Sequence, residues 1–120
     1  MNIEHLNEHG INLAVISSDQ AVITDVQSAL DLIMTVKYET GAERIAIPKE
    51  LICEEFFILS TGIAGEILQK FINYHVKAAI YGDYSHYTSK PLRDFIYESN
   101  NSTQVGFQPT VEAALAWLDQ

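Results

Sequence analysis

Short apolar runs alternate along the chain with stretches in which apolar residues recur every three or four positions. The short runs are rich in β-branched and aromatic residues and end in turn-forming residues, so they predict strands over residues 3–6, 11–16, 44–48, 77–81 and 104–107. Residues 21–23 form a shorter strand candidate. The helical spacing predicts helices over residues 24–40, 61–74, 89–100 and 110–118.

Helices that alternate with short strands are typical of a mainly parallel sheet covered by helices. The first two strands are close in sequence, across residues 7–10, and we expect them to pair in antiparallel fashion. The pattern therefore predicts one α/β domain over residues 1–120, with a mixed, mainly parallel sheet of about five strands and about four helices.

Local signals add detail to two of these helices. Residues 24–27 have the pattern of a capping box, with Thr24 at the N-cap of the first helix. Gly65 is expected to let the second helix approach the sheet or a neighbouring helix closely. The apolar stripe of that helix predicts a buried face made of Ile63, Ile67, Leu68, Phe71 and Ile72.

The chain is acidic, with sixteen Asp and Glu against seven Lys and Arg and a net charge of −9. It has no run of basic residues that could neutralise phosphates, which argues against binding to nucleic acids or to anionic membranes. The excess of acid either serves solubility alone or forms a docking face for a basic partner.

The chain also lacks the signs of a membrane or secreted protein. No apolar run approaches the roughly 18 residues of a membrane span, and the first residues lack the basic and apolar segments of a secretion signal. Cys53 has no second cysteine to pair with, which fits a reducing compartment, so we expect a cytoplasmic protein. The four histidines show no metal-ligand spacing, and we expect neither a metal nor a cofactor.

Two polar segments are candidates for a functional surface. Ser60, Thr61 and Gly62 lie at a predicted helix start, where free N–H groups favour anions; either hydroxyl is a candidate for phosphorylation, and ordinary N-capping is the alternative. Residues 82–90 follow a predicted strand, so they lie at the edge of the sheet where open α/β folds bind ligands.

The second segment carries several kinds of reactive or recognition group. Asp83, His86 and Lys90 are candidates for an acid, a base and an anion clamp, and Tyr84 and Tyr87 for stacking on a ring. Loops of this composition are also common without any function. The adjacent acids of residues 54–55 point in different directions on any regular element, so a solvated pair is favoured over catalytic carboxylates.

The order of elements and the turn at residues 57–63 resemble STAS domains, named for sulfate transporters and anti-sigma-factor antagonists. In the antagonists a similar turn, Asp-Ser-Ser-Gly-Leu, is phosphorylated on the serine before the glycine. Thr61 stands at that serine and Leu59 at the aspartate. The resemblance covers most of residues 11–118 and implies a STAS-like fold with a regulatory role.

Residues 24–30, 65–73 and 87–95 are more closely similar to bacterial proteins of domain-of-unknown-function family 4180. That family implies no particular activity. We therefore expect a non-enzymatic regulatory or protein-interaction module with an unidentified protein partner, and the sequence leaves open whether two copies associate. A module that binds a small ligand or nucleotide is the alternative, and an enzyme using Asp83 and His86 is the third. All three readings use the same surface, namely Ser60, Thr61, Gly62, Asp83, Tyr84, His86 and Ser89.

Overall fold

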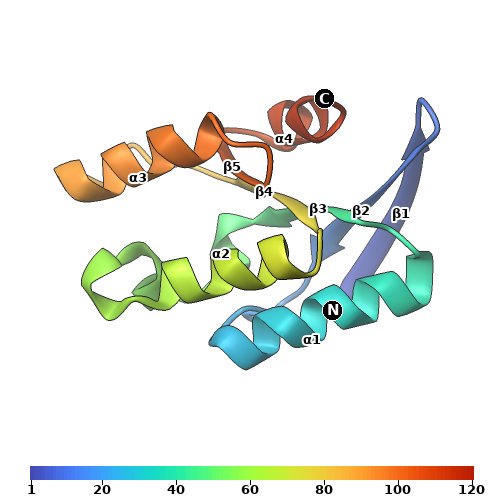
Figure 1. Cartoon of the computed structure of the whole chain (residues 1–120), viewed down its shortest axis with the longest axis horizontal. Helices are drawn as coiled ribbons and strands as arrows, with labels where there is room; N and C mark the ends of the chain where they lie inside the picture. Colours follow the sequence, from blue (N-terminus) through green and yellow to red (C-terminus); the bar gives the residue numbers. More distant parts are fainter.

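The computed structural model describes residues 1–120 and contains a five-stranded sheet in the order β1-β2-β3-β4-β5 (Figure 1). β1 pairs with β2 in antiparallel fashion, and every other neighbouring pair is parallel. The expected mixed, mainly parallel sheet is therefore confirmed. The strands are β1 (Asn2–Glu8), β2 (Ile11–Ser17), β3 (Arg44–Pro48), β4 (Lys77–Tyr81) and β5 (Val105–Gln108).

Four helices cover the sheet, as the sequence predicts, and α4 lies on the opposite face from the other three (Figure 1). Three short 3₁₀ turns, η1 (Lys49–Leu51), η2 (Glu54–Phe57) and η3 (Leu59–Thr61), lead from β3 to α2. None of the helices is both long and apolar enough to cross a membrane. The helices are α1 (Val26–Thr40), α2 (Ile63–Asn73), α3 (Lys90–Asn100) and α4 (Val111–Leu118).

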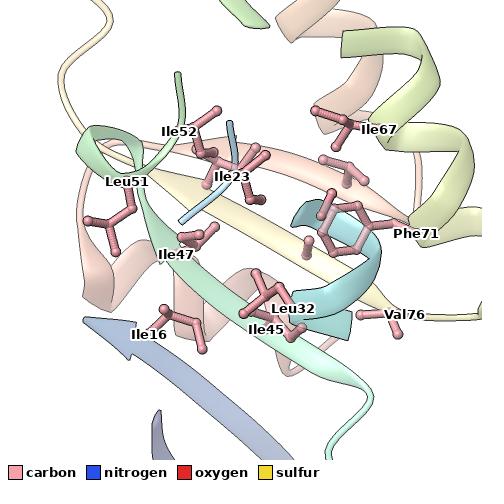
Figure 2. Close-up of a cluster of buried hydrophobic side chains, with 14 of the residues drawn as sticks. Ile16, Ile23, Leu32, Ile45, Ile47, Leu51, Ile52, Ile67, Phe71 and Val76 are labelled. Atoms are coloured by element: carbon pink, nitrogen blue, oxygen red, sulfur yellow. The ribbon is translucent and has the colours of Figure 1, made fainter. Parts of the chain in front are cut away.

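The main core lies between the sheet and helices α1, α2 and α3. Side chains alternate across a strand, so Ile45 and Ile47 of β3 both point into this core, where Ile67 and Phe71 of α2 meet them (Figure 2). Each of these four side chains is at least 98% buried. Burial of one such side chain contributes roughly 1.5–3 kcal/mol, so this layer supplies most of the driving force for folding.

The second core is thinner and lies under α4. Ala46 and Ala79 point to this face of the sheet, and their small side chains let Trp117 and Leu118 of α4 pack close to the strands. At Gly106 of β5 the packing is closer still, since a Cβ atom there would lie 2.7 Å from Cε2 of Trp117. The glycine therefore makes room for the indole ring.

The expected close approach at Gly65 is wrong. Nothing lies within 4 Å of the position that a Cβ atom would take there, and the residue is exposed on α2. Ile72 was expected in the buried face but is 42% exposed. Consecutive residues of a helix point about 100° apart. Because Phe71 points into the core, Ile72 points away from it, toward solvent.

Two helix starts differ from the predicted ones. The capping box of α1 uses Asp25 and Ser28 instead of Thr24, because the Asp25 carboxylate accepts from the Ser28 amide at 2.7 Å and Ser28 Oγ accepts from the Asp25 amide at 3.0 Å. α2 begins after Gly62, whose φ of 78° breaks the helical path. The short strand expected at residues 21–23 is only a single bridge between Ile23 and Ile52.

Substitution by alanine should have opposite effects at Gly106 and at Gly65. Gly106→Ala should lower the free energy of unfolding by about 1–3 kcal/mol, because the added methyl group overlaps Trp117. Gly65→Ala should raise it by about 1 kcal/mol, because alanine is the better helix former and meets no neighbour. Urea melts of both variants check this, and equal effects of the two substitutions would contradict the packing described.

Candidate functional site

The candidate site lies where β3 and β4 end side by side. Pro48 and Tyr81 are the last register partners of these parallel strands, so the residues that follow them leave the sheet at the same edge. β3 continues into Lys49, and β4 continues into the loop of residues 82–89. A Cβ atom at Gly82 would lie 2.8 Å from Cβ of Lys49, so the glycine lets the lysine stem pack directly against the end of β4.

Three rings, those of Phe57, Tyr84 and Tyr87, form an aromatic cluster at this edge. The rings of Phe57 and Tyr87 stack with their centroids 5.3 Å apart, and Tyr84 lies 6.1 Å from Phe57. The Tyr84 hydroxyl donates to the Ile80 carbonyl at 2.8 Å. Burial raises the pKa of Tyr84 well above its ordinary value, so this ring is a packed, neutral group at any physiological pH.

The ammonium group of Lys49 lies on the aromatic cluster. Its Nζ is 4.9 Å from the ring centroid of Tyr87 and 5.4 Å from that of Phe57, both within the range of a cation–π interaction. Lys49 forms no ion pair with a carboxylate, although the chain has sixteen of them. The Tyr87 hydroxyl donates to Glu54 at 3.0 Å, which adds negative charge beside the ring that the ammonium group faces.

The predicted residues of the loop have different environments. Asp83 is exposed and accepts from the Ser85 amide at 2.8 Å. Hydrogen bonding to the side chain of Ser85, and then to its backbone, holds the pKa of Asp83 below the ordinary value. The imidazole of His86 lies against Tyr87, with centroids 4.2 Å apart. No hydrogen bond or ion pair joins Asp83 to His86, so the structure does not assemble them as an acid–base pair.

Ser89 and Lys90 stabilise the first turns of α3. Ser89 is the N-cap of the helix, and its hydroxyl accepts from the Leu92 amide at 3.4 Å. Lys90 forms an ion pair with Asp94 one turn further along, with a distance of 2.7 Å. Lys90, suggested as an anion clamp, is thus paired with a carboxylate of its own helix.

Thr61 does not cap α2 in the usual way. Thr61 is exposed and lies in η3. Its hydroxyl lies within hydrogen-bond distance of two carbonyls, that of Glu55 at 2.9 Å and that of Ile58 at 2.8 Å, and acts as the donor toward both. Ser60 is exposed, and the N-cap residue Gly62 provides no side-chain hydrogen bond. The hydroxyl of Thr61 therefore holds the η2–η3 turn in shape.

The contact between the two predicted segments runs through Phe57, which precedes Thr61 in the same group of turns and stacks on Tyr87 of the loop. The sequence interpretation missed Lys49 as part of this edge, and it missed the contact that the buried ring of Phe57 makes with the loop. Lys49 follows directly after a predicted strand, as residues 82–90 do, and this placement is the signal from which it could have been identified. Phe57 carried no such signal, because its place depends on the path of η2.

The structure offers no metal centre and no cavity at this edge. No group of three or more His, Cys, Asp or Glu side chains is placed to hold a metal ion. Cys53 is half-buried, and burial raises the pKa of its thiol. The three hollows of the molecule lie elsewhere: one at the starts of β3 to β5, one beside Met1 and Ser17, and one between α1 and α2.

Comparison with known proteins places the chain in a family. The model of a family described as a domain of unknown function, DUF4180, matches residues 8–118. The chain belongs to the DUF4180 family. No curated protein and no solved structure matches it. The family is the one that residues 24–30, 65–73 and 87–95 suggested, and its description assigns no activity to any residue of the edge described above.

Tyr84→Phe tests the packing of the aromatic cluster. The substitution should cost about 1 kcal/mol at neutral pH, because the hydrogen bond from the hydroxyl to the Ile80 carbonyl is lost. Above about pH 10 the unfolded chain releases the Tyr84 proton and the folded chain keeps it, so Tyr84 lowers stability as the pH rises. Wild type should therefore lose more stability between neutral and alkaline pH than Tyr84→Phe does.

The matched control is Tyr38→Phe, at a residue that is 91% exposed. It should leave both the stability and its pH dependence unchanged. Urea melts between neutral pH and about pH 11 give both quantities. If Tyr84→Phe shows the same alkaline loss as wild type, Tyr84 is not the buried phenol described.

Proposed function

We propose that this chain is a non-enzymatic regulatory module that binds a basic protein partner. The contact surface comprises the aromatic cluster and the η2–η3 turn. One observation carries the proposal: this surface already holds an ammonium group, that of Lys49, on the rings of Tyr87 and Phe57. The rings and the carboxylates around them favour positive charge at this edge, which is the charge that a basic partner brings.

The charge around the aromatic cluster favours the same kind of partner. Glu50, Glu54, Glu55 and Asp83 lie on the turns and loop of this edge, and all four are exposed. Lys49 is the only Lys or Arg in the same segments. Carboxylates in such excess attract a basic protein and speed its association. The net charge of −9 then serves recognition as well as solubility.

An exposed apolar side chain offers the surface an anchor. Ile58 is 50% exposed and lies between η2 and η3. Its carbonyl accepts from both the amide and the hydroxyl of Thr61, at 3.0 and 2.8 Å, so the turn that presents the isoleucine is fixed in shape. An apolar residue on a rigid turn with charged neighbours matches the usual arrangement of an interface centre and its rim.

Thr61 supplies a means of regulation. Phosphorylation would replace the hydroxyl proton that reaches the carbonyls of Glu55 and Ile58, and it would add negative charge beside the proposed anchor. Both effects alter the surface without touching the core. This part of the proposal extends the resemblance of residues 57–63 to the phosphorylated turn of STAS antagonists.

A module for a small ligand or nucleotide is the second reading of the same edge. Such ligands bind in hollows of several hundred Å³, whereas here the rings of the aromatic cluster fill the space between η2 and the loop. The packing of these rings favours a protein contact over a small-molecule pocket.

The test compares two substitutions of exposed isoleucines on the same protein. Ile58→Ser removes the proposed anchor, and Ile72→Ser changes a residue of similar exposure, 42% against 50%, at the far end of α2. Partners are captured from a lysate of the source cells by each variant and by wild type, and are quantified by mass spectrometry. A specific basic partner should lose about tenfold or more in binding to Ile58→Ser and keep its binding to Ile72→Ser.

Both substitutions are at exposed positions and should leave the melting temperature nearly unchanged. Capture that is equal for both variants and wild type would contradict the proposed surface. A thermal-shift screen against nucleotides and metabolites accompanies the capture, and a shift of several degrees that Tyr87→Leu abolishes would favour the small-ligand reading instead.

A further inference from the structure

The two edges of the sheet are built differently, and the β5 edge is closed by α3. The Phe107 amide donates to Oδ1 of Asn100. The Val105 carbonyl accepts from the hydroxyls of Ser99 and Ser102. The Ser and Asn side chains thus occupy backbone groups of β5 that a further strand would need.

β1, at the other edge of the sheet, has no such cover (Figure 1). Its residues pair with those of β2 in an unbroken register, without a bulge. The strand contains no proline, lysine or arginine, which are the residues that commonly protect an edge. All of its residues except Ile3 and Leu6 are exposed. β1 is therefore a regular, open edge to which a further strand can pair.

The turn between β1 and β2 determines which backbone groups of β1 face outward. His9 and Gly10 form a two-residue turn, with φ values of 55° and 80°. Such a turn closes on a hydrogen-bonded pair, here Glu8 with Ile11. Hydrogen-bonded and non-hydrogen-bonded pairs alternate along an antiparallel ladder. The N–H and C=O groups of residues 3, 5 and 7 therefore point away from β2.

We infer that β1 pairs in antiparallel fashion with β1 of a second copy, about a twofold axis at His5. This register sets His5 opposite His5 and Ile3 opposite Asn7 of the second copy. Each outward N–H group of one copy then meets an outward C=O group of the other. The sheets of the two copies become one continuous sheet, and the aromatic cluster takes no part in the contact.

The charges of β1 select this register over its neighbours. Glu4 lies opposite Leu6 of the second copy, and Glu8 lies opposite Asn2, so no two carboxylates are directly opposed. A slip of two residues keeps every side chain on its own face of the sheet. In one direction that slip sets Glu4 against Glu4, and in the other it sets Glu4 against Glu8. Like charges directly opposite each other destabilise a strand pair, so the register about His5 is favoured.

The mass of the full chain in solution, measured by sedimentation equilibrium over a range of concentrations, tests the pairing. A contact between two short strands is smaller than the roughly 1,200–2,000 Å² of a stable interface, so the dimer should be weak and should form as the concentration rises. Because each copy carries a net charge of −9, added salt should strengthen the dimer.

Hydrogen exchange followed by NMR reports which amides take part. Exchange should slow with rising concentration at Ile3, His5 and Asn7, whose amides have no partner in the single copy. The amides of Glu4 and Leu6 already bond to β2, so their exchange should respond far less. This alternating response along β1 distinguishes strand pairing from a contact between side chains.

Two substitutions move the dimer in opposite directions. His5→Lys sets two ammonium groups opposite each other at the axis and should weaken the dimer about threefold. Asn2→Lys sets a lysine opposite Glu8 of the second copy, twice in each dimer, and should tighten it about threefold. The control is Tyr38→Lys, which adds the same charge at a 91% exposed position of α1. All three positions are exposed, so the melting temperature of the single copy should change little.

A chain that stays monomeric at every concentration, with unchanged exchange along β1, would overturn the inference and leave this edge to an extended segment of another protein. A dimer that His5→Lys and Asn2→Lys affect no differently from Tyr38→Lys would also overturn it, because such a dimer uses another surface. Opposite shifts of the two β1 variants about the control support the pairing.

Discussion

The pairing of β3 with β4 is the constraint on which the rest of the structure depends. Five register pairs, from Arg44 with Lys77 to Pro48 with Tyr81, join the two strands in parallel. The three inner residues of each strand are buried, with apolar layers on both faces of the sheet. A slip of one residue would send every side chain of a strand to the other face, so the two layers together fix the register.

The composition of the two strands explains why the layers differ. β3 reads Ile-Ala-Ile between its end residues, and its alanine points to the same face as Ala79 of β4. The large side chains meet three helices, and the small ones leave space for a single helix whose indole ring lies against Gly106. On the face under α4 both strands carry alanine, at Ala46 and Ala79, which is why a single helix packs close to the sheet there.

The same register gives the two ends of the sheet opposite chemistry. At the carboxyl ends it places Lys49 beside Gly82 and exposes acids and aromatic rings, which we assign to a basic protein partner. At the amino ends it places Arg44 beside Lys77, and both side chains donate to main-chain oxygens at the end of α4. The exposed residues of the proposed protein-binding surface, Ile58 and Thr61, lie outside the main core, so they can be altered without loss of the fold.

The sequence predicted the strands, the helices and the parallel sheet, because these depend on local periodicity. It placed the cap of α1 one residue too early, at Thr24, since several neighbouring polar residues were able to fill that role. It chose Gly65 over Gly106 for close packing, because only the fold brings Trp117 against β5. Arg44 and Lys77 gave no signal as a pair, since they are far apart in the chain and only the register joins them.

The register of β3 against β4 in solution is the most direct test of this account. Nuclear Overhauser effects between backbone protons of the two strands, in isotope-labelled protein, report it residue by residue. In the register described, contacts pair Ala46 with Ala79 and Arg44 with Lys77. Contacts that pair Ala46 with Ala78 or with Ile80 would contradict it, because a shifted register would dismantle both cores and separate Lys49 from Gly82.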